Sequence, residues 1–115
     1  MGDRALVIFK ADKEVSPTVY LHWHGSDVPE LVGILKERMA GRIGDACYAC
    51  ARFTGICHNN IDGNLGLGLM NTPEHVQAAV LGEDRDVLLN YSHGDAGVVV
   101  VDATDFSWKA FGGYL

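Results

Sequence analysis

Two histidines one residue apart, His22 and His24, have a type and spacing that could support metal chemistry. Because alternate side chains of a β-strand point to the same face, a strand here would aim both imidazoles in one direction, as ligands of zinc, copper or nickel. No third ligand follows at a recognisable spacing, so the fold would have to supply one from His58, His75, His93 or Asp95. The pattern favours a solvated sheet face, and a metal site built on His22, His24, His58 and His93 stays the alternative.

Three cysteines form the second candidate group. Cys47 and Cys50 have the C-x-x-C spacing of zinc and redox sites, and Cys57 follows in the same apolar stretch. On a helix, which rises about 1.5 Å per residue, Cys50 and Cys57 would lie roughly 10 Å apart, too far for one tetrahedral ion. The nearby carboxylate of Asp45 also disfavours a reactive thiolate. We therefore expect structural cysteines, reduced as in a cytoplasmic protein, with Cys50 and Cys57 in the core.

No motif for nucleophilic catalysis or nucleotide binding is complete. Ser92, His93 and Asp95 include the residue types of a catalytic triad, but neighbours in sequence seldom face one another, and no G-x-S-x-G motif surrounds Ser92. The glycines near residue 66 match neither the dinucleotide-binding pattern nor a P-loop. The sequence therefore predicts a protein that is not an enzyme, with no catalytic residue and no cofactor.

The acidic residues are unevenly distributed along the chain. Residues 1–60 carry seven acids and seven bases, whereas residues 61–115 carry eight acids and two bases, so the second half supplies the whole net charge of −6. A surface built from these acids would attract a basic protein and repel nucleic acid and anionic membranes. The candidate contact residues are Glu83, Asp84, Asp86, Asp95, Asp102 and Asp105, with Tyr20 and Trp23 as aromatic anchors. An ordinary solvated surface that maintains solubility explains the same acids equally well.

In the first half of the chain, apolar spacing and turn residues predict the elements that must position these side chains. Residues 5–11 and 18–23 are rich in β-branched and aromatic side chains and predict a hairpin, with residues 12–17 as its connection. A capping-box pattern followed by apolar residues at helical spacing predicts a helix over residues 27–39. A second apolar stripe predicts a helix over residues 45–58.

The second half of the chain is predicted to form mostly strands. Turn residues over 59–64 precede strands predicted at 65–69, 87–91, 97–102 and 106–111, with a short helix inserted at 73–81. The order is ββαα and then β(α)βββ. It predicts an α+β fold of two layers, with a mostly antiparallel sheet of about five to six strands packed against two main helices. The length of 115 residues and the hydrophobic content of 48% fit a single domain over residues 1–115.

Four segments of the chain are distinctive together: 16–25 (SPTVYLHWHG), 51–57 (ARFTGIC), 63–69 (GNLGLGL) and 97–102 (GVVVVD). In these segments the chain resembles a group of small bacterial proteins, some of which belong to phages or integrated mobile elements. The resemblance spans most of the chain and carries no catalytic motif. It implies a compact acidic inhibitor, similar to anti-CRISPR proteins, that acts by binding a host protein.

We therefore expect a small non-enzymatic binding protein that docks on a basic surface of a host nucleic-acid-handling complex, without itself contacting nucleic acid. The sequence contains no run of about 20 apolar residues and no signal peptide, which predicts a cytoplasmic protein away from membranes. A homodimer formed through exposed strand edges or aromatic residues is the remaining alternative.

Overall fold

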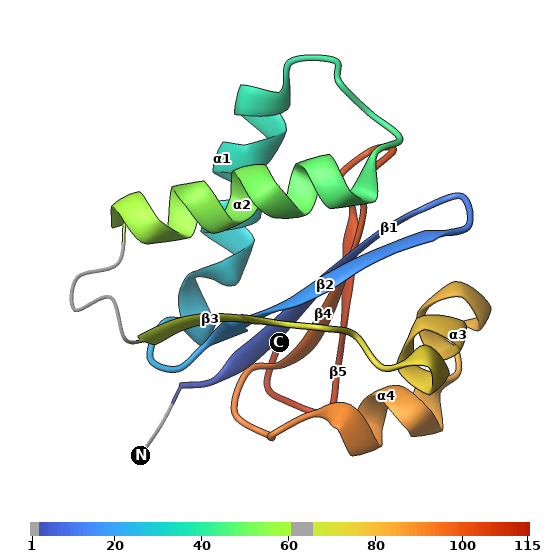
Figure 1. The fold of residues 1–115 in the computed structure, drawn as a ribbon. Coiled ribbons are helices and arrows are strands. Elements are labelled where there is room, and N and C mark those ends of the chain that lie inside the picture. Colours follow the sequence, from blue (N-terminus) through green and yellow to red (C-terminus); the bar gives the residue numbers. More distant parts are fainter. Residues whose placement is uncertain (1–2, 61–65) are drawn as a thin grey trace.

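A five-stranded sheet with helices on both sides organises the protein (Figure 1). The computed structural model describes residues 3–60 and 66–115. The elements are β1 (Ala5–Ala11), β2 (Glu14–Leu21), the 3-10 turn η1 (Gly25–Asp27), α1 (Val28–Met39), α2 (Ala46–Asn60), β3 (Leu67–Met70), α3 (Glu74–Gly82), α4 (Arg85–Tyr91), β4 (Gly97–Asp102) and β5 (Trp108–Phe111). The strand order is β3-β2-β1-β4-β5, and every neighbouring pair is antiparallel except β1 with β4, which is parallel.

The central strands β1 and β4 are apolar along nearly their whole length because both of their faces are covered. On one face of β1, Val7 and Phe9 pack with α1 and α2 in the larger core. On the other face, Leu6 and Ile8 pack with α3 and α4 in a second core. Alternate residues of a single strand therefore supply two separate cores, as the period-2 geometry of a strand requires.

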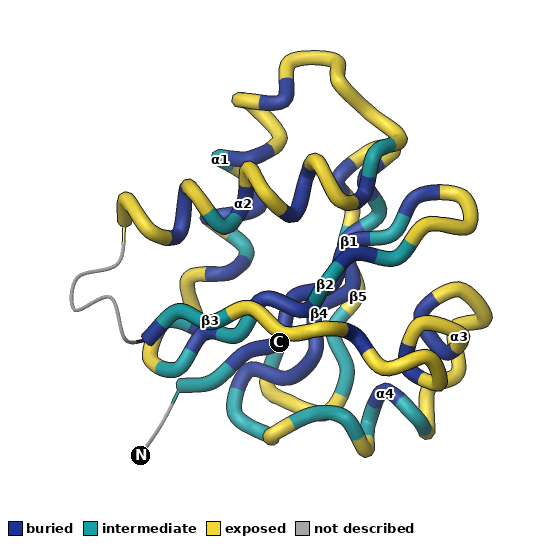
Figure 2. Tube along the Cα trace, viewed as in Figure 1, coloured by how far each residue is buried: buried dark blue, intermediate teal, exposed yellow. Residues whose placement is uncertain are grey.

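This arrangement has three layers, with α1 and α2 on one face of the sheet and α3 and α4 on the other (Figures 1 and 2). The α+β class and the mostly antiparallel sheet are confirmed, and the strand count is five. The expectation of two layers is wrong, because α3 and α4 bury their own apolar residues against the sheet. No helix of the described residues is long and apolar enough to span a bilayer.

The largest error in the predicted elements concerns residues 87–91, which form most of helix α4 and not a strand. Asp84 caps this helix, since its side chain accepts a hydrogen bond from the Val87 backbone N–H at 3.4 Å. Val87, Leu88 and Tyr91 then share one helical face and pack in the second core. A short apolar run fits either a buried strand or one side of a short helix, so its spacing alone could not decide.

The other predicted elements are present with shifted ends. β2 begins at Glu14, so Ser16 and Pro17 lie inside the strand and only the tip of the hairpin is a turn. Ser16 Oγ accepts a buried hydrogen bond from the Phe9 backbone N–H at 2.9 Å, beside the irregularity that the hairpin register shows between Ile8 and Lys10. The turn predicted over 59–64 and the first residues of the strand predicted at 65–69 fall partly outside the described residues; β3 begins at Leu67.

Candidate functional site

The two helical layers carry charge of opposite sign. The stretch from α3 through α4, residues 74–91, has four acids and one base, for a net charge of −3. The stretch from α1 through α2, residues 28–60, has three acids and four bases, for a net charge of +1. The two stretches lie on opposite faces of the sheet (Figure 1). The uneven charge along the chain thus becomes a charge difference across the molecule.

The exposed acids of the α3 and α4 layer form what we call the α3–α4 acidic surface, defined by Glu74, Glu83, Asp84 and Asp86. Glu83 pairs with Lys109 of β5 at 2.9 Å, and this hydrogen bond and charge hold the pKa of the Glu83 carboxyl below its usual range. Asp84 and Asp86 lie at the N-terminus of α4, where a negative charge interacts favourably with the helix dipole and stabilises the helix. Part of this surface therefore also stabilises local structure.

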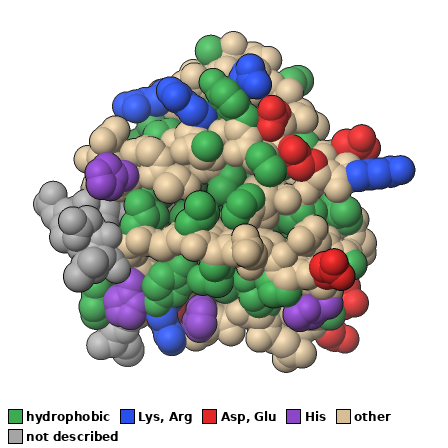
Figure 3. Space-filling view, viewed as in Figure 1, with side chains coloured by type: hydrophobic (Ala, Val, Ile, Leu, Met, Phe, Trp, Pro, Cys, Tyr) green, Lys and Arg blue, Asp and Glu red, His purple; other side chains and the backbone are tan. Residues whose placement is uncertain are grey.

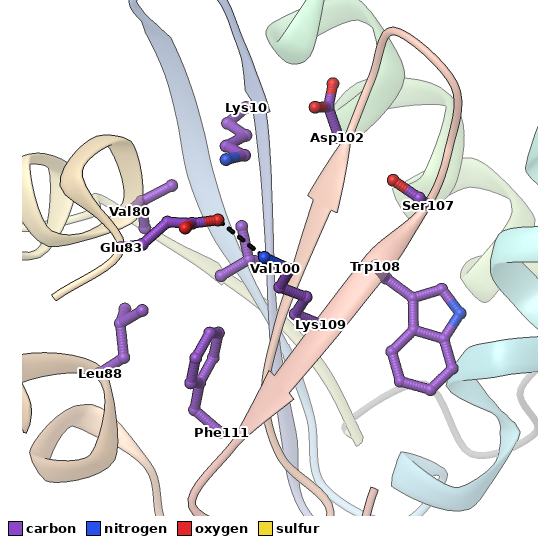
Figure 4. A pocket seen from close by; sticks show the side chains of 10 residues that line it. All are labelled: Lys10, Val80, Glu83, Leu88, Val100, Asp102, Ser107, Trp108, Lys109 and Phe111. Atoms are coloured by element: carbon purple, nitrogen blue, oxygen red, sulfur yellow. Dashed lines mark hydrogen bonds and ion pairs between the residues drawn. The ribbon is translucent and has the colours of Figure 1, made fainter. Parts of the chain in front are cut away.

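A pocket of about 220 Å³ adjoins this surface, between α3 and the strands β4 and β5 (Figure 4). Its apolar floor consists of Val80, Leu88, Val100 and Phe111. Its polar lining consists of Lys10, Glu83, Asp102, Ser107 and Lys109. In Figure 4 the Glu83–Lys109 ion pair bridges α3 and β5 over Val100. The lining combines both signs of charge with an apolar base, which suits the aliphatic stem and charged head of a basic side chain.

Asp102 ends β4 and Asp105 lies in the turn that leads to β5, at the same end of the sheet as the pocket. Asp102 accepts hydrogen bonds from the Thr104 backbone N–H at 2.9 Å and from its hydroxyl at 2.6 Å. Asp105 accepts equivalent bonds from Ser107, and these bonds lower the pKa of the Asp105 carboxyl. The β1 and β4 register also places Lys10 opposite Asp102. Both acids therefore stabilise the turn, and Asp102 also faces a cation.

Asp95 does not join the other acids. It precedes β4 at the opposite end of the sheet, where its carboxylate accepts hydrogen bonds from the backbone N–H and from Nε of Arg4, both at 3.0 Å. These contacts lower the pKa of the Asp95 carboxyl. The structure thus brings Glu83, Asp84, Asp86 and Asp102 to one region and holds Asp95 apart, paired with a base. The second-half acids do not form one continuous field.

Of the two predicted aromatic anchors, Tyr20 packs against the second core beneath α3 and α4, and Trp23 lies beyond the end of β2. Tyr20 is half-buried, and its ring contacts the His93 ring edge-on at a centroid distance of 5.8 Å. Its hydroxyl and Nδ1 of His22 are hydrogen-bonded at 2.6 Å. The His22 ring in turn meets the Trp23 ring at 4.2 Å, and Trp23 is 57% exposed. These rings form a continuous aromatic row beside the edge strand β3.

The histidines are not arranged as the strand pattern predicted. β2 ends at Leu21, so His22 and His24 lie beyond the strand, and His24 Nδ1 contacts the Asp27 carboxylate at 3.0 Å. His58 is exposed in the last turn of α2. Within residues 3–60 and 66–115, no group of three or more His, Cys, Asp or Glu side chains is placed to hold a metal ion.

The cysteines are placed as their helical spacing predicted. Cys50 and Cys57 are buried in the larger core, and Cys47 is exposed on the outer side of α2. Burial raises the pKa of the Cys57 thiol to about 12, and burial also raises the pKa of Cys50. Partial burial and the neighbouring Glu14 carboxylate raise the pKa of Cys47. None of the three thiols is activated for nucleophilic chemistry.

Thiol labelling should distinguish these positions. With a maleimide or a disulfide reagent at neutral pH, we expect one thiol per folded chain to react, slowly, and all three to react in denaturant. Cys47→Ser should remove the reaction of the folded protein, whereas Cys57→Ser should leave it unchanged. Rapid labelling of two or three thiols under native conditions would contradict the buried positions of Cys50 and Cys57.

The sequence predicted exposed strand edges only as a general dimer contact, and it did not identify which strand forms the apolar edge of the sheet. β3 forms one edge, and its Leu69 and Met70 side chains are 58% and 39% exposed. The alternation of leucine with glycine predicted a half-buried strand, but an edge position depends on strand order, which alternation does not encode.

The chain matches no protein-family model, no curated protein and no solved structure.

Proposed function

We propose that this protein is a non-enzymatic binding protein whose α3–α4 acidic surface docks on a basic surface of a partner protein. The observation that carries the proposal is the separation of charge between the two helical layers, −3 on one face and +1 on the other. A basic partner is attracted to the first face and not to the second, so the charge difference orients the encounter as well as accelerating it.

The strength of such docking depends on how freely the acids can meet the partner. Glu74, Asp84 and Asp86 are exposed and form no ion pair among the described residues. Glu83 is paired with Lys109, but both side chains are more than half exposed, and such surface ion pairs contribute little to stability. A partner arginine could therefore displace Lys109 at little cost and use Glu83 as well.

The adjoining pocket supplies the apolar contact that charge alone lacks. A lysine or arginine stem lying on Val100 and Phe111 would bring its charged head between Glu83 and Asp102. Binding energy concentrates where a buried anchor is surrounded by polar contacts. The partner is thus expected to present a cluster of basic residues, one of which enters the pocket.

The resemblance to small phage and mobile-element proteins extends this proposal to a partner class. A protein that handles nucleic acid in the cytoplasm carries a basic groove, and an acidic surface that occupies the groove would act as an inhibitor in the manner of anti-CRISPR proteins. Docking on such a groove involves no contact between this chain and nucleic acid, which its net charge of −6 disfavours.

A matched pair of charge reversals tests the docking surface. The double variant Glu83→Lys with Asp86→Lys and the control Glu30→Lys with Glu37→Lys both change the net charge from −6 to −2, on opposite helical layers. Asp84 is left in place because it caps α4. A partner is first captured from host lysate at low salt and identified, and its affinity for each variant is then measured.

We expect the α3–α4 double variant to bind the captured partner at least about a hundredfold more weakly, and the α1–α2 control to stay within about threefold. The affinity of the unmodified protein should fall steeply with added salt, because exposed charges are screened beyond about 8 Å at physiological ionic strength. Equal losses in both variants would mean that net charge and not this surface attracts the partner, and equal retention would remove charge-driven docking altogether.

A further inference from the structure

The edge strand β3 forms an uncharged, apolar part of the protein surface. Residues 66–73 contain no Asp, Glu, Lys or Arg, and the large hydrophobic side chains of Trp23, Leu69 and Met70 are exposed. β3 lies at the front in Figure 1, and in the same view Figure 3 shows hydrophobic side chains above and below its backbone, with the charged side chains toward the periphery. Edge strands are usually protected by charge, proline or a covering element.

The backbone of β3 can accept another strand. His22 N donates to Gly66 O at 2.8 Å, and hydrogen-bonded pairs alternate along an antiparallel ladder, so Gly66, Gly68 and Met70 are the positions bonded to β2. The N–H and C=O groups of Leu67 and Leu69 therefore point away from β2. No described strand pairs with this side of β3.

We propose that a second copy of this chain occupies this edge, so that the two β3 strands pair antiparallel about a two-fold axis at Gly68 and join two five-stranded sheets into one. In this register Leu67 of one copy exchanges both backbone hydrogen bonds with Leu69 of the other. The two Gly68 residues then form the close, non-bonded pair, with Cα atoms about 4.5 Å apart. Glycine suits this position because no side chain separates the strands.

The side chains of the two copies complement one another in this register. Paired residues share a face, so the exposed Leu69 side chain would pack beside Leu67 of the second copy, on the face of α1 and α2. On the other face Met70 would lie over Gly66 of the second copy. The indole of Trp23 is the nearest side chain to Gly66, with Cδ1 3.2 Å from where a Cβ would stand, so Met70 would contact this ring.

Charge and space also favour a second copy at this edge over other parts of the surface. Two chains of net charge −6 repel one another, and this repulsion costs least at a segment such as residues 66–73, which carries no charged side chain. The two β2 strands would lie three strand spacings apart, roughly 14 Å. Because α2 packs against β2, the α2 helices of two copies, which need 8–10 Å between their axes, have room side by side.

The contact area predicts a weak dimer. The exposed parts of Trp23, Leu69 and Met70 amount to roughly 300 Å² of apolar surface per copy, well below the ~800 Å² per partner of a stable complex. We therefore expect weak dimerisation that depends on concentration, with a monomer at low concentration. Added salt should strengthen the dimer or leave it unchanged, because it screens the repulsion between like-charged copies.

Sedimentation over about three orders of magnitude in concentration should show the monomer giving way to a dimer. Leu69→Lys should weaken dimerisation at least tenfold without unfolding the protein, since the Leu69 side chain is 58% exposed. Leu81→Lys is the matched control, because Leu81 is an exposed leucine on α3 away from the edge, and it should leave the dissociation constant unchanged. A monomer at every concentration would overturn the proposal.

A crosslink tests the register itself. In a Cys47→Ser background, Gly68→Cys should form a disulfide between two copies under mild oxidation, since Cα atoms 4.4–6.8 Å apart permit one. A Cβ at Gly68 meets the Tyr20 side chain at an ordinary 3.7 Å, so the variant should fold. Met70→Cys is the control, because in this register its two copies lie roughly 14 Å apart and should not crosslink.

Both tests are independent of the proposed docking function. Crosslinking of Met70→Cys and not of Gly68→Cys would overturn the register, and crosslinking of neither would overturn the β3 pairing. A dimer that weakens with salt would also contradict an uncharged edge contact. Binding of a basic partner weakens with salt and depends on Glu83 and Asp86, so the failure of one proposal leaves the other testable.

Discussion

Phe53→Ala is expected to lower the free energy of unfolding by about 3 to 5 kcal/mol, the usual cost of truncating a buried phenylalanine. Phe53 projects from α2 into the larger core with no exposed surface, and its ring meets the Phe9 ring of β1 edge-on at a centroid distance of 5.3 Å. The cavity would lie where α2 is fixed to the sheet. Because the total free energy of unfolding of a small domain is about 5–15 kcal/mol, the variant should be close to unfolded under mild conditions.

Urea unfolding followed by circular dichroism measures this loss as a lower midpoint with an unchanged slope. Phe53→Leu is the first control and should cost less than about 1.5 kcal/mol, because it keeps most of the volume. Phe111→Ala is the second, since Phe111 is only partly buried at the rim of the second core, and it should cost less than Phe53→Ala. If Phe53→Ala and Phe111→Ala destabilised equally, α2 would not be held by this core contact.

The local elements of the fold could be predicted where the sequence repeats a signal over several turns. In α1, five buried side chains recur at helical spacing after an acidic first turn, and the predicted range differs from the observed one by a single residue. The helix α4 was missed because it is only seven residues long, too short for its period to differ clearly from that of a strand. Because residues 87–91 were expected to form a strand, the helical layer on the second face of the sheet was not predicted.

The candidate site could be predicted only in part, because it depends on contacts between distant residues. That Glu83, Asp84 and Asp86 are exposed followed from their sequence. That Arg4 neutralises Asp95 depends on the parallel pairing of β1 with β4, ninety residues apart in the chain, which no local pattern encodes. The same holds for Lys109 and Glu83, and for the position of β3 at the edge.

The second prediction with a large effect concerns Gly97, where the backbone at the start of β4 lies close to the backbone at and after the end of β5. Gly97 begins β4 with a φ angle of +99°, and a Cβ at this position would stand 2.5 Å from the Phe111 carbonyl oxygen and 2.9 Å from Gly113 N. Both neighbours are backbone atoms and cannot rotate away. Gly97→Ala is therefore expected to combine backbone strain with a steric clash, and to destabilise the protein by about 3 kcal/mol or more.

Two further glycines separate these causes in the same urea experiment. Gly94 has a φ angle of +82° but nothing within 4 Å of its missing Cβ, so Gly94→Ala should show the backbone strain alone, about 1–2 kcal/mol. Gly33 lies exposed inside α1 with an open surrounding, so Gly33→Ala should stabilise the protein by about 0.5–1 kcal/mol. If Gly97→Ala lowered the free energy of unfolding no more than Gly94→Ala does, the backbone after β5 would be able to move away from the new Cβ at no cost. The β4 and β5 pairing would then not fix the position of the chain end against Gly97.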